Sequence, residues 1–289
     1  MAKMQKLKVE EFPKKLLEIP HPPKQLYVEG KLPSEDDYIF LTVVGSRKFS
    51  TYGKDACEKI IGELAGQNIV IVSGLAYGID AIAHKSAIKN GLKTIAVPGS
   101  GLSRKVLYPS LNRKIAEEIL TNDGALLSEF DPEQPATLYT FPQRNRIMTG
   151  LSDAVLVIEA TDKSGTLITA RLAVDYNREL MVVPGSIFSP NSTGSNKLIN
   201  QGATPVSSGE DVLKQLGIDT ETKQKTLDLN NPALSENERK VLSILSIEPH
   251  QRDELIQKLS LPISEANTML SIMEIKGLIV ESVGEIRIS

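Results

Sequence analysis

The strongest constraint on this chain is a local arrangement that recurs five times in its first two hundred residues. A short run rich in Val and Ile ends at a turn that contains glycine, and a helix-like segment follows. The turns are residues 44–47 (VGSR), 73–78 (SGLAYG), 98–101 (PGSG), 163–166 (KSGT) and 184–186 (PGS). Strands that are apolar on both faces and alternate with helices indicate a parallel sheet covered on both sides. The sequence therefore predicts a doubly wound α/β domain.

The same turns predict a site for anions. A strand that leads into a helix through glycine leaves backbone N–H groups unpaired at the positive end of the helix dipole. Because the carboxyl ends of parallel strands meet at one edge of the sheet, we expect the five turns to lie side by side. A row of five anion sites suits a polyanion better than a single nucleotide. Known nucleotide fingerprints are missing: there is no GxxxxGK[ST] loop, and Arg104 stands where a GxGxxG turn starting at Gly99 needs its third glycine.

Four segments follow from the patterning along the chain. Residues 1–37 are rich in Pro and Lys and predict an irregular lead-in, because proline interrupts helices. The α/β domain is expected over residues 38–217, followed by a polar linker over residues 218–233. Residues 234–289 show three short amphipathic helices and then two short strands, which is the order of a winged helix-turn-helix domain.

Individual elements are predicted from the period of the apolar residues. In the α/β domain we expect strands at Ile39–Val44, Ile69–Ser73, Thr94–Val97, Ala125–Ser128, Ala154–Ile158, Leu180–Val183 and Thr204–Val206. The helices between them are expected at Lys54–Ala65, Asp80–Lys89, Leu111–Leu120, Leu167–Asn177 and Asn196–Gln201. In the tail we expect helices at Ser235–Ser246, Gln251–Leu259 and Ile263–Ile275, and strands at Leu278–Glu281 and Glu285–Ile288.

Composition restricts the cofactors and the location. A hydrophobic content of 40% with 24% charged residues is typical of soluble globular proteins. No apolar run approaches the roughly 20 residues that a membrane helix needs, and residues 1–20 are too charged for a signal peptide. We therefore predict a cytoplasmic protein without membrane contact. Cys57 is the only cysteine, and His21, His84 and His250 lack the spacing of metal ligands. We expect no disulfide, no metal and no cofactor, and a packed rather than reactive His84.

The net charge of −3 hides an uneven distribution of charge. Residues 232–289 carry 9 acidic and 6 basic side chains, so the preceding part of the chain is neutral overall and can still present a basic groove. The third helix of the tail carries Glu265, Glu274 and only Lys276, which is too little positive charge to lie among phosphates. We expect the tail to contact a protein or to serve a structural role.

A basic and aromatic cluster stands in the string FPQRNRIM. Arg144 and Arg146 flank Asn145 just beyond Pro142, which suits the start of a helix. An arginine at such a position can pair with phosphate through two hydrogen bonds, and the adjacent Phe141 can stack on an exposed base. The alternative is an ordinary solvated helix face.

Further charge and hydroxyl groups follow neighbouring strands. Arg47, beside Gly45 and Ser46, adds a guanidinium group at the same sheet edge, and Lys48 and Lys85 add diffuse positive charge. These residues make a basic groove plausible.

Hydroxyl and carboxyl groups at the same edge allow a second interpretation. Ser164, Gly165 and Thr166 can cap a helix or bind an anion, since both use the same geometry. Asp80 and Glu159 also belong to this edge, and a pair of carboxylates raises the question of acid–base catalysis. The simpler interpretation of Asp80, which follows a glycine turn, is an N-terminal cap of a helix.

In this order, the motifs resemble those of the DNA-processing protein A family (DprA, also called Smf). The resembling strings are VGSR at 44–47, SGLAYGID at 73–80, VPGSGL at 97–102 with Tyr108-Pro109 following, FPQRNRI at 141–147, SGTLITA at 164–170 and VPG at 183–185. The resemblance covers residues 38–217, and the tail resembles the winged-helix domain of many members. The N-terminal helical domain of some members has no counterpart in the lead-in, so a role of that domain does not transfer.

The resemblance implies a Rossmann-like domain and a function without catalysis. It implies a protein that binds single-stranded DNA, protects incoming strands and loads the RecA recombinase during natural transformation (competence) and recombination. It also implies a homodimer formed through the Rossmann-like domain, with an interface expected around Leu198–Val206. The DNA-binding residues that it implies are Gly45, Ser46, Arg47, Lys85, Phe141, Arg144, Asn145, Arg146, Ser164, Gly165 and Thr166.

Two alternatives remain open at this stage. A Rossmann-like group of nucleoside-monophosphate phosphoribohydrolases uses a PGGxGTxxE loop, and residues 164–169 resemble its GTxx portion. Thr169 stands at the position of the catalytic Glu, which removes the carboxylate that stabilises an oxocarbenium-like sugar. The second alternative is a scaffold that binds only other proteins, which a lack of single-strand binding would favour.

Overall fold

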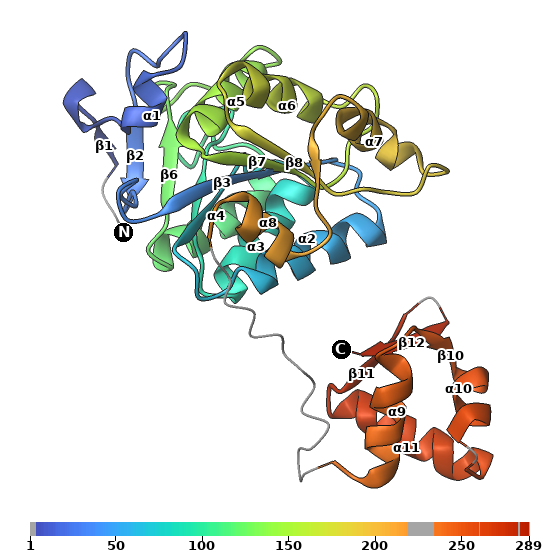
Figure 1. The fold of residues 1–289 in the computed structure, drawn as a ribbon. Helices are drawn as coiled ribbons and strands as arrows, with labels where there is room; N and C mark the ends of the chain where they lie inside the picture. Colours follow the sequence, from blue (N-terminus) through green and yellow to red (C-terminus); the bar gives the residue numbers. More distant parts are fainter. Residues whose placement is uncertain (1–3, 219–233, 260, 283, 289) are drawn as a thin grey trace. The chain divides into compact units, whose positions relative to one another are not determined.

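In the computed structural model, residues 4–218, 234–259, 261–282 and 284–288 are described. The chain divides into two compact units, Met1–Thr220 and Glu221–Ser289, and each has a hydrophobic core of its own. Figure 1 shows the larger unit as a sheet between two layers of helices and the smaller one as three helices with a small sheet. The predicted linker, residues 218–233, falls outside the described residues except for Ile218.

A nine-stranded sheet in the order β1-β2-β6-β5-β4-β3-β7-β8-β9 forms the larger unit. Its strands are β1 (Gln5–Lys6), β2 (Tyr27–Gly30), β3 (Ile39–Val44), β4 (Ile69–Ser73), β5 (Lys93–Ala96), β6 (Ala125–Ser128), β7 (Ala154–Val157), β8 (Glu179–Val182) and β9 (Thr204–Pro205). The seven strands from β6 to β9 in this order pair in parallel. The predicted doubly wound fold is confirmed, and each predicted strand lies within one residue of its observed bounds.

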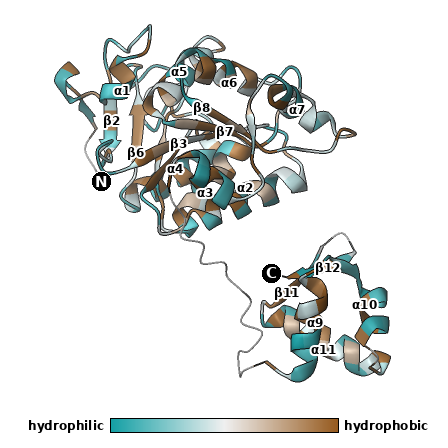
Figure 2. Cartoon of the chain, in the orientation of Figure 1, coloured by the Kyte–Doolittle hydropathy of each residue, from teal (hydrophilic) through white to brown (hydrophobic). Residues whose placement is uncertain are grey.

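Helices cover both faces of the sheet, as Figure 1 shows. They are α1 (Lys14–Leu17), α2 (Thr51–Glu63), α3 (Ile79–Lys89), α4 (Arg113–Thr121), α5 (Thr140–Leu151), α6 (Thr166–Asp175), α7 (Thr193–Asn200) and α8 (Gly209–Gln215). Side chains of α1, α5, α6 and α7 pack on one face, and those of α2, α3 and α8 on the other. Figure 2 shows the hydrophobic strands between these layers. Burial of the strands on both faces explains their continuous apolar runs.

The expectation of an irregular lead-in over residues 1–37 is wrong. Strand β2 pairs antiparallel with β6 along all four of its residues, from Tyr27 opposite Ser128 to Gly30 opposite Ala125. Leu16, Leu26 and Val28 are buried in the core. The prolines obscured this pattern because they limit helices to short pieces without preventing a four-residue strand at the sheet margin.

The smaller unit has the winged helix-turn-helix order. It contains α9 (Glu236–Leu245), β10 (His250–Gln251), α10 (Arg252–Leu259), α11 (Ile263–Ile275), β11 (Ile279–Ser282) and β12 (Glu285–Ile288), with a sheet in the order β10-β12-β11. Ser235 begins α9 with a capping box: its hydroxyl accepts from the Glu238 N–H, and the Glu238 carboxylate accepts from the Ser235 N–H. The predicted helices and wing are confirmed.

Two kinds of feature are absent from the described residues. None of their helices combines the length and the apolar character required to cross a membrane. No group of three or more His, Cys, Asp or Glu side chains in this part of the chain could hold a metal ion.

Candidate functional site

A hollow opens where the strand order of the sheet reverses. Strand β3 lies between β4, the next strand in the chain, and β7, which comes much later, and ligand crevices of open α/β sheets form at such a switch point. The hollow has a volume of about 540 Å³. We call it the switch-point hollow. Nine of the eleven predicted site residues line it: Gly45, Ser46, Arg47, Phe141, Arg144, Asn145, Ser164, Gly165 and Thr166.

The N-terminus of α6 forms one wall of the switch-point hollow. Helix α6 begins at Thr166, and its first turn holds no acidic side chain. The Ser164 hydroxyl bonds to the Thr166 hydroxyl (2.9 Å) and accepts from the Thr166 N–H (3.2 Å), so these groups are held in place. A Cβ added to Gly165 would meet no atom within 4 Å. The N–H groups of Thr166, Leu167 and Ile168 donate to Ser164 and Gly165 within the turn, so an anion at this wall would meet the positive end of the helix dipole rather than free backbone donors.

Arg47 and Phe141 form the mouth of the switch-point hollow. The exposed Arg47 guanidinium lies over the Phe141 ring, with its central carbon 5.1 Å from the ring centroid. Gly99 lies against the ring, because an added Cβ would come within 2.6 Å of it. Phe141 is therefore contacted by a glycine and a guanidinium, and Arg47 carries a positive charge at the entrance together with the exposed Lys48.

Arg144 is buried behind this entrance and connects neighbouring elements by hydrogen bonds. Its Nη1 donates to the carbonyl oxygens of Gly74 and Val97, and its Nε donates to Oδ1 of Asn145 (3.1 Å). Burial lowers the pKa of Arg144 to about 10, opposed by the negative charge of Asp80, so the side chain stays cationic at neutral pH. Arg144 contributes positive charge to the hollow while it joins the ends of β4 and β5 to α5.

The N–H groups of the turn after β4 are bound by a carboxylate of the same chain. Oδ2 of the buried Asp80 accepts from the N–H groups of Gly74 (3.1 Å) and Ala76 (3.3 Å). Burial raises the pKa of Asp80, and the Arg144 charge and these two hydrogen bonds oppose that rise. Two expectations are therefore wrong: these N–H groups are not available to an external anion, and Asp80 does not cap α3, whose N-cap residue Gly78 has no side-chain bond.

The expected row of five anion sites is also wrong at two further turns. The Gly101 N–H donates to the Gln134 carbonyl oxygen (2.8 Å), and the Gly185 N–H donates to Oδ1 of Asn196 (3.2 Å). Their glycines serve close packing, since a Cβ on Gly101 would lie 2.1 Å from the Asp131 oxygen. Of the five turns, those after β3 and β7 line the switch-point hollow.

Two predicted site residues lie elsewhere. Arg146 forms an ion pair with Glu129 and donates to the carbonyl oxygen of His21 (2.6 Å), so it joins α5 to the N-terminal segment. Lys85 is exposed on α3 and does not line the switch-point hollow. The periodicity of α5 explains the first result: Arg144 and Arg146 are two positions apart and therefore face different sides of the helix.

Asn191 lines the switch-point hollow and was not predicted. It comes from the turn Pro190–Ser192, and its Nδ2 donates to the Lys48 carbonyl oxygen (3.1 Å). The two residues are 143 positions apart in the chain. No local pattern marks such an asparagine, because only the folded sheet brings the turns after β3 and β8 together.

Glu159 lies outside the switch-point hollow. Its carboxylate accepts from the Ser50 N–H (2.9 Å) and the Ser50 hydroxyl (2.5 Å), and so anchors the start of α2. It lines a neighbouring hollow with Tyr52 and the turn after β8. Because Asp80 and Glu159 each satisfy the donors of a different loop, they do not form an acid–base pair.

His84 is packed, as predicted, and gives a pH-dependent stability. It is fully buried, its Nδ1 bonds to the Thr94 hydroxyl (2.7 Å), and its Nε2 is buried without a hydrogen-bond partner. Burial, followed by the Arg144 charge, lowers the pKa of His84 to about 3. An unfolded histidine has a pKa of about 6.5, so the unfolded state binds the extra proton between these values. The free energy of unfolding contributed by neutral His84 is complete above pH 6.5 and is lost as the pH falls toward 3.

We expect the free energy of unfolding to fall between pH 6.5 and pH 5, by up to ~1.4 kcal/mol per pH unit from this group. Urea unfolding at several pH values measures that slope. The variant His84→Gln retains an amide donor for Thr94 and removes the titrating ring, so it should show a shallower slope. An equal slope in both proteins would contradict this assignment.

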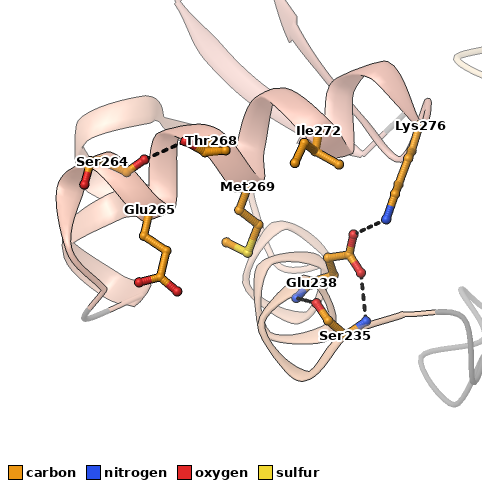
Figure 3. A pocket seen from close by; sticks show the side chains of 8 residues that line it. All are labelled: Ser235, Glu238, Ser264, Glu265, Thr268, Met269, Ile272 and Lys276. Carbon is orange, nitrogen blue, oxygen red and sulfur yellow. Dashed lines mark hydrogen bonds and ion pairs between the residues drawn. The ribbon is translucent and has the colours of Figure 1, made fainter.

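A second hollow lies between α9 and α11 of the winged-helix unit, and Figure 3 shows its lining. Lys276 pairs with Glu238 (2.7 Å) at one end, and Glu265 lies along α11 with Ser264, Thr268 and Ile272. The one lysine of this helix end is thus engaged by a carboxylate. This arrangement agrees with the prediction that α11 has too little free positive charge to lie among phosphates.

Comparisons with known proteins agree for both units. Residues 3–217 match the family model of DNA recombination-mediator protein A, and residues 225–285 match the DprA winged helix domain. The Smf protein of Escherichia coli is 42% identical over 205 residues, which cover 71% of this chain. The chain spans about half the length of that relative, 54%.

Two solved structures are similar to the larger unit. DNA processing protein A of Streptococcus pneumoniae has a TM-score of 0.68 at 40% identity, covering 74% of this chain and 74% of that one. DNA processing protein A of Helicobacter pylori, solved to study its single-stranded DNA binding mode, has a TM-score of 0.66 at 31% identity and covers 74% of this chain and 96% of that one.

Proposed function

Because the chain belongs to the DNA recombination-mediator protein A family, we propose that it binds single-stranded DNA in the switch-point hollow. The observation that carries this proposal is the meeting of three features in one hollow: the positive end of α6, the exposed guanidinium of Arg47 and the Phe141 ring. A helix N-terminus and a guanidinium group each bind phosphate, and a ring offers a surface for bases.

A single strand fits these features better than a duplex does. Backbone N–H groups and arginine contact phosphates irrespective of sequence, and an aromatic ring can stack only on a base that is not already stacked in a duplex. The solved relative from Helicobacter pylori has a single-stranded DNA binding mode, which supports the same substrate class here.

We further propose that the bound strand is handed to RecA, in the protection and recombination of incoming DNA during natural transformation. The family description as a recombination mediator supports this role, since a mediator acts between a strand and a recombinase.

A homodimer through the Rossmann-like domain is the assembly that we propose. Within the expected region around Leu198–Val206, Leu198 and Val206 are buried in the cores of the same unit. The accessible part of this region borders a hollow between α6, α7 and β9, which is also lined by the exposed Val174 of α6. Light scattering of the protein and of Val174→Glu would test this assembly, with loss of the dimer expected for the variant.

A gel-shift titration with single- and double-stranded oligonucleotides over a salt series tests the DNA proposal. We expect a preference for the single strand and an affinity that falls with salt, because bound phosphates release counterions. Repeating the titration with RecA tests the handover. No preference for the single strand would refute the proposal and favour the scaffold alternative.

The phosphoribohydrolase alternative gains no support from the site. Thr169 lines the switch-point hollow at the position of the catalytic Glu, and Asp80, the carboxylate among its lining residues, is occupied by two loop N–H groups. Release of free base from AMP by the purified protein would reopen this alternative.

A further inference from the structure

A row of three aromatic rings runs from the switch-point hollow onto the neighbouring surface. The centroids of Phe141 and Tyr108 are 5.8 Å apart, and those of Tyr108 and Tyr77 are 6.4 Å apart. We propose that Tyr108 and Tyr77 form a base-stacking subsite for the single strand as it leaves the hollow on the side of α3 and α4. This inference rests on the proposed function and gives the strand a direction.

The two tyrosines are more accessible to bases than Phe141 is. Tyr108 is 42% exposed and Tyr77 is 38% exposed, although burial of a tyrosine ring would remove apolar surface from water. Phe141 is half-buried, with the Arg47 guanidinium over its ring and Gly99 in close contact with it. A base would have to displace Arg47 to stack fully on Phe141, whereas the tyrosines lie beyond this pair.

The loops that carry the tyrosines are held together by side-chain bonds. Nδ2 of the buried Asn112 donates to the carbonyl oxygens of Leu75 (2.8 Å) and Ala76 (3.0 Å), which joins the start of α4 to the loop of Tyr77. The Tyr108 N–H donates to the Ser100 hydroxyl (3.3 Å). These bonds hold the two loops in place before a ligand binds. Binding therefore costs little conformational entropy for ordering the loops.

The subsite is continuous with the mouth of the switch-point hollow. Gly78, with a φ of +80°, lies so close to the turn after β3 that a Cβ would come within 2.3 Å of the Ser46 oxygen and 2.8 Å of Arg47 Cα. Tyr77, the residue before Gly78, therefore lies next to the backbone of Arg47. A strand whose phosphate contacts Arg47 reaches the tyrosine rings without crossing a gap.

The ring orientations specify how the bases are arranged. Tyr108 is tilted by 54° to Phe141, and Tyr77 by 77° to Tyr108. One base cannot lie flat on two of these rings, so each tyrosine takes a separate base and the bases are splayed apart. Stacking of this kind tolerates any base, because every base has a π face.

The test uses oligothymidylates of two lengths, about 4 and about 20 nucleotides, since single-strand sites span roughly 4–16 nucleotides per binding fold. The variants are Tyr108→Leu and Tyr77→Leu, with the Phe replacements at both positions as rescue. Each Leu variant should weaken binding of the long oligonucleotide roughly 5- to 100-fold and leave the short one nearly unchanged. The Phe variants should bind like the unsubstituted protein.

Tyr52→Leu is the matched control, because Tyr52 is 51% exposed but lies on α2, next to the turn after β8. It should bind both oligonucleotides normally; a loss confined to this variant would mean that the strand leaves on the opposite side and would overturn the subsite. Normal long-strand binding by both Leu variants would also overturn it. If the unsubstituted protein binds neither length, the proposed function itself fails. The chain contains no Trp, so quenching of tyrosine fluorescence by bound DNA gives a second readout, which should diminish in the Tyr108 and Tyr77 variants.

Discussion

Arg47→Ala should weaken binding of single-stranded DNA by about 1.5–3 kcal/mol, or roughly 10- to 150-fold, the range for a hydrogen bond to a charged group. Arg47 is exposed at the mouth of the switch-point hollow, so the substitution removes a charge with little cost in packing. The dependence of log affinity on log salt should also become shallower by about 0.7, the value for one phosphate on a single strand. Fluorescence anisotropy over a salt series measures both quantities.

Lys214→Ala is the matched control for this prediction. It removes one exposed positive charge from the same domain, but from α8 and outside the switch-point hollow. Its effect on affinity and on the salt dependence should be much smaller. Equal effects of the two substitutions would mean that binding depends on overall charge rather than on the hollow.

Asp80→Ala should destabilise the larger unit by about 3–5 kcal/mol, because it leaves the Arg144 guanidinium buried beside no counter-charge. Asp80 and Arg144 are both less than 6% exposed, and each lowers the cost of burying the other. The substitution also leaves the N–H groups of Gly74 and Ala76 without their acceptor. Urea unfolding followed by circular dichroism measures the loss.

A double-mutant cycle identifies the cause of this loss. Asp80→Asn keeps an oxygen acceptor for the loop and removes the charge, so it should cost less than Asp80→Ala. In the background of Arg144→Met, which removes the buried guanidinium, Asp80→Ala should cost less than it does alone. If the costs of the two substitutions simply add, the carboxylate acts on the loop and not on Arg144.

The sheet could be predicted from the sequence because buried parallel strands produce an unmistakable pattern. Ile39–Val44, Ile69–Ser73 and Ala125–Ser128 have the predicted bounds, and each is buried almost throughout. Strand β2 escaped prediction because prolines flank it, Pro20, Pro22 and Pro23 before it and Pro33 after it. Among the described residues it pairs with β1 and β6, and no local pattern encodes a partner about 100 positions away.

The site could be predicted in part, and the errors have one physical origin. Gly45–Arg47 and Ser164–Thr166 were found because strand-to-helix turns after β3 and β7 must meet at the switch point. Sequence alone could not distinguish a turn that is open to a ligand from one that is satisfied within the chain. Asp80 and Asn196 accept hydrogen bonds from the N–H groups of two of these turns, and Glu129 forms an ion pair with Arg146. Each of these contacts depends on tertiary placement.

The two margins of the nine-stranded sheet restrict how the protein can assemble. One margin is β1 and the other is β9, and each has two residues, with Pro205 in β9. A strand of two residues presents very few unpaired backbone N–H and C=O groups, and proline has no backbone N–H to donate. Such margins disfavour the addition of an extended segment from a neighbouring chain. We therefore expect self-association of this unit to use side-chain packing between helices and to leave the hydrogen-bonded sheet confined to one molecule.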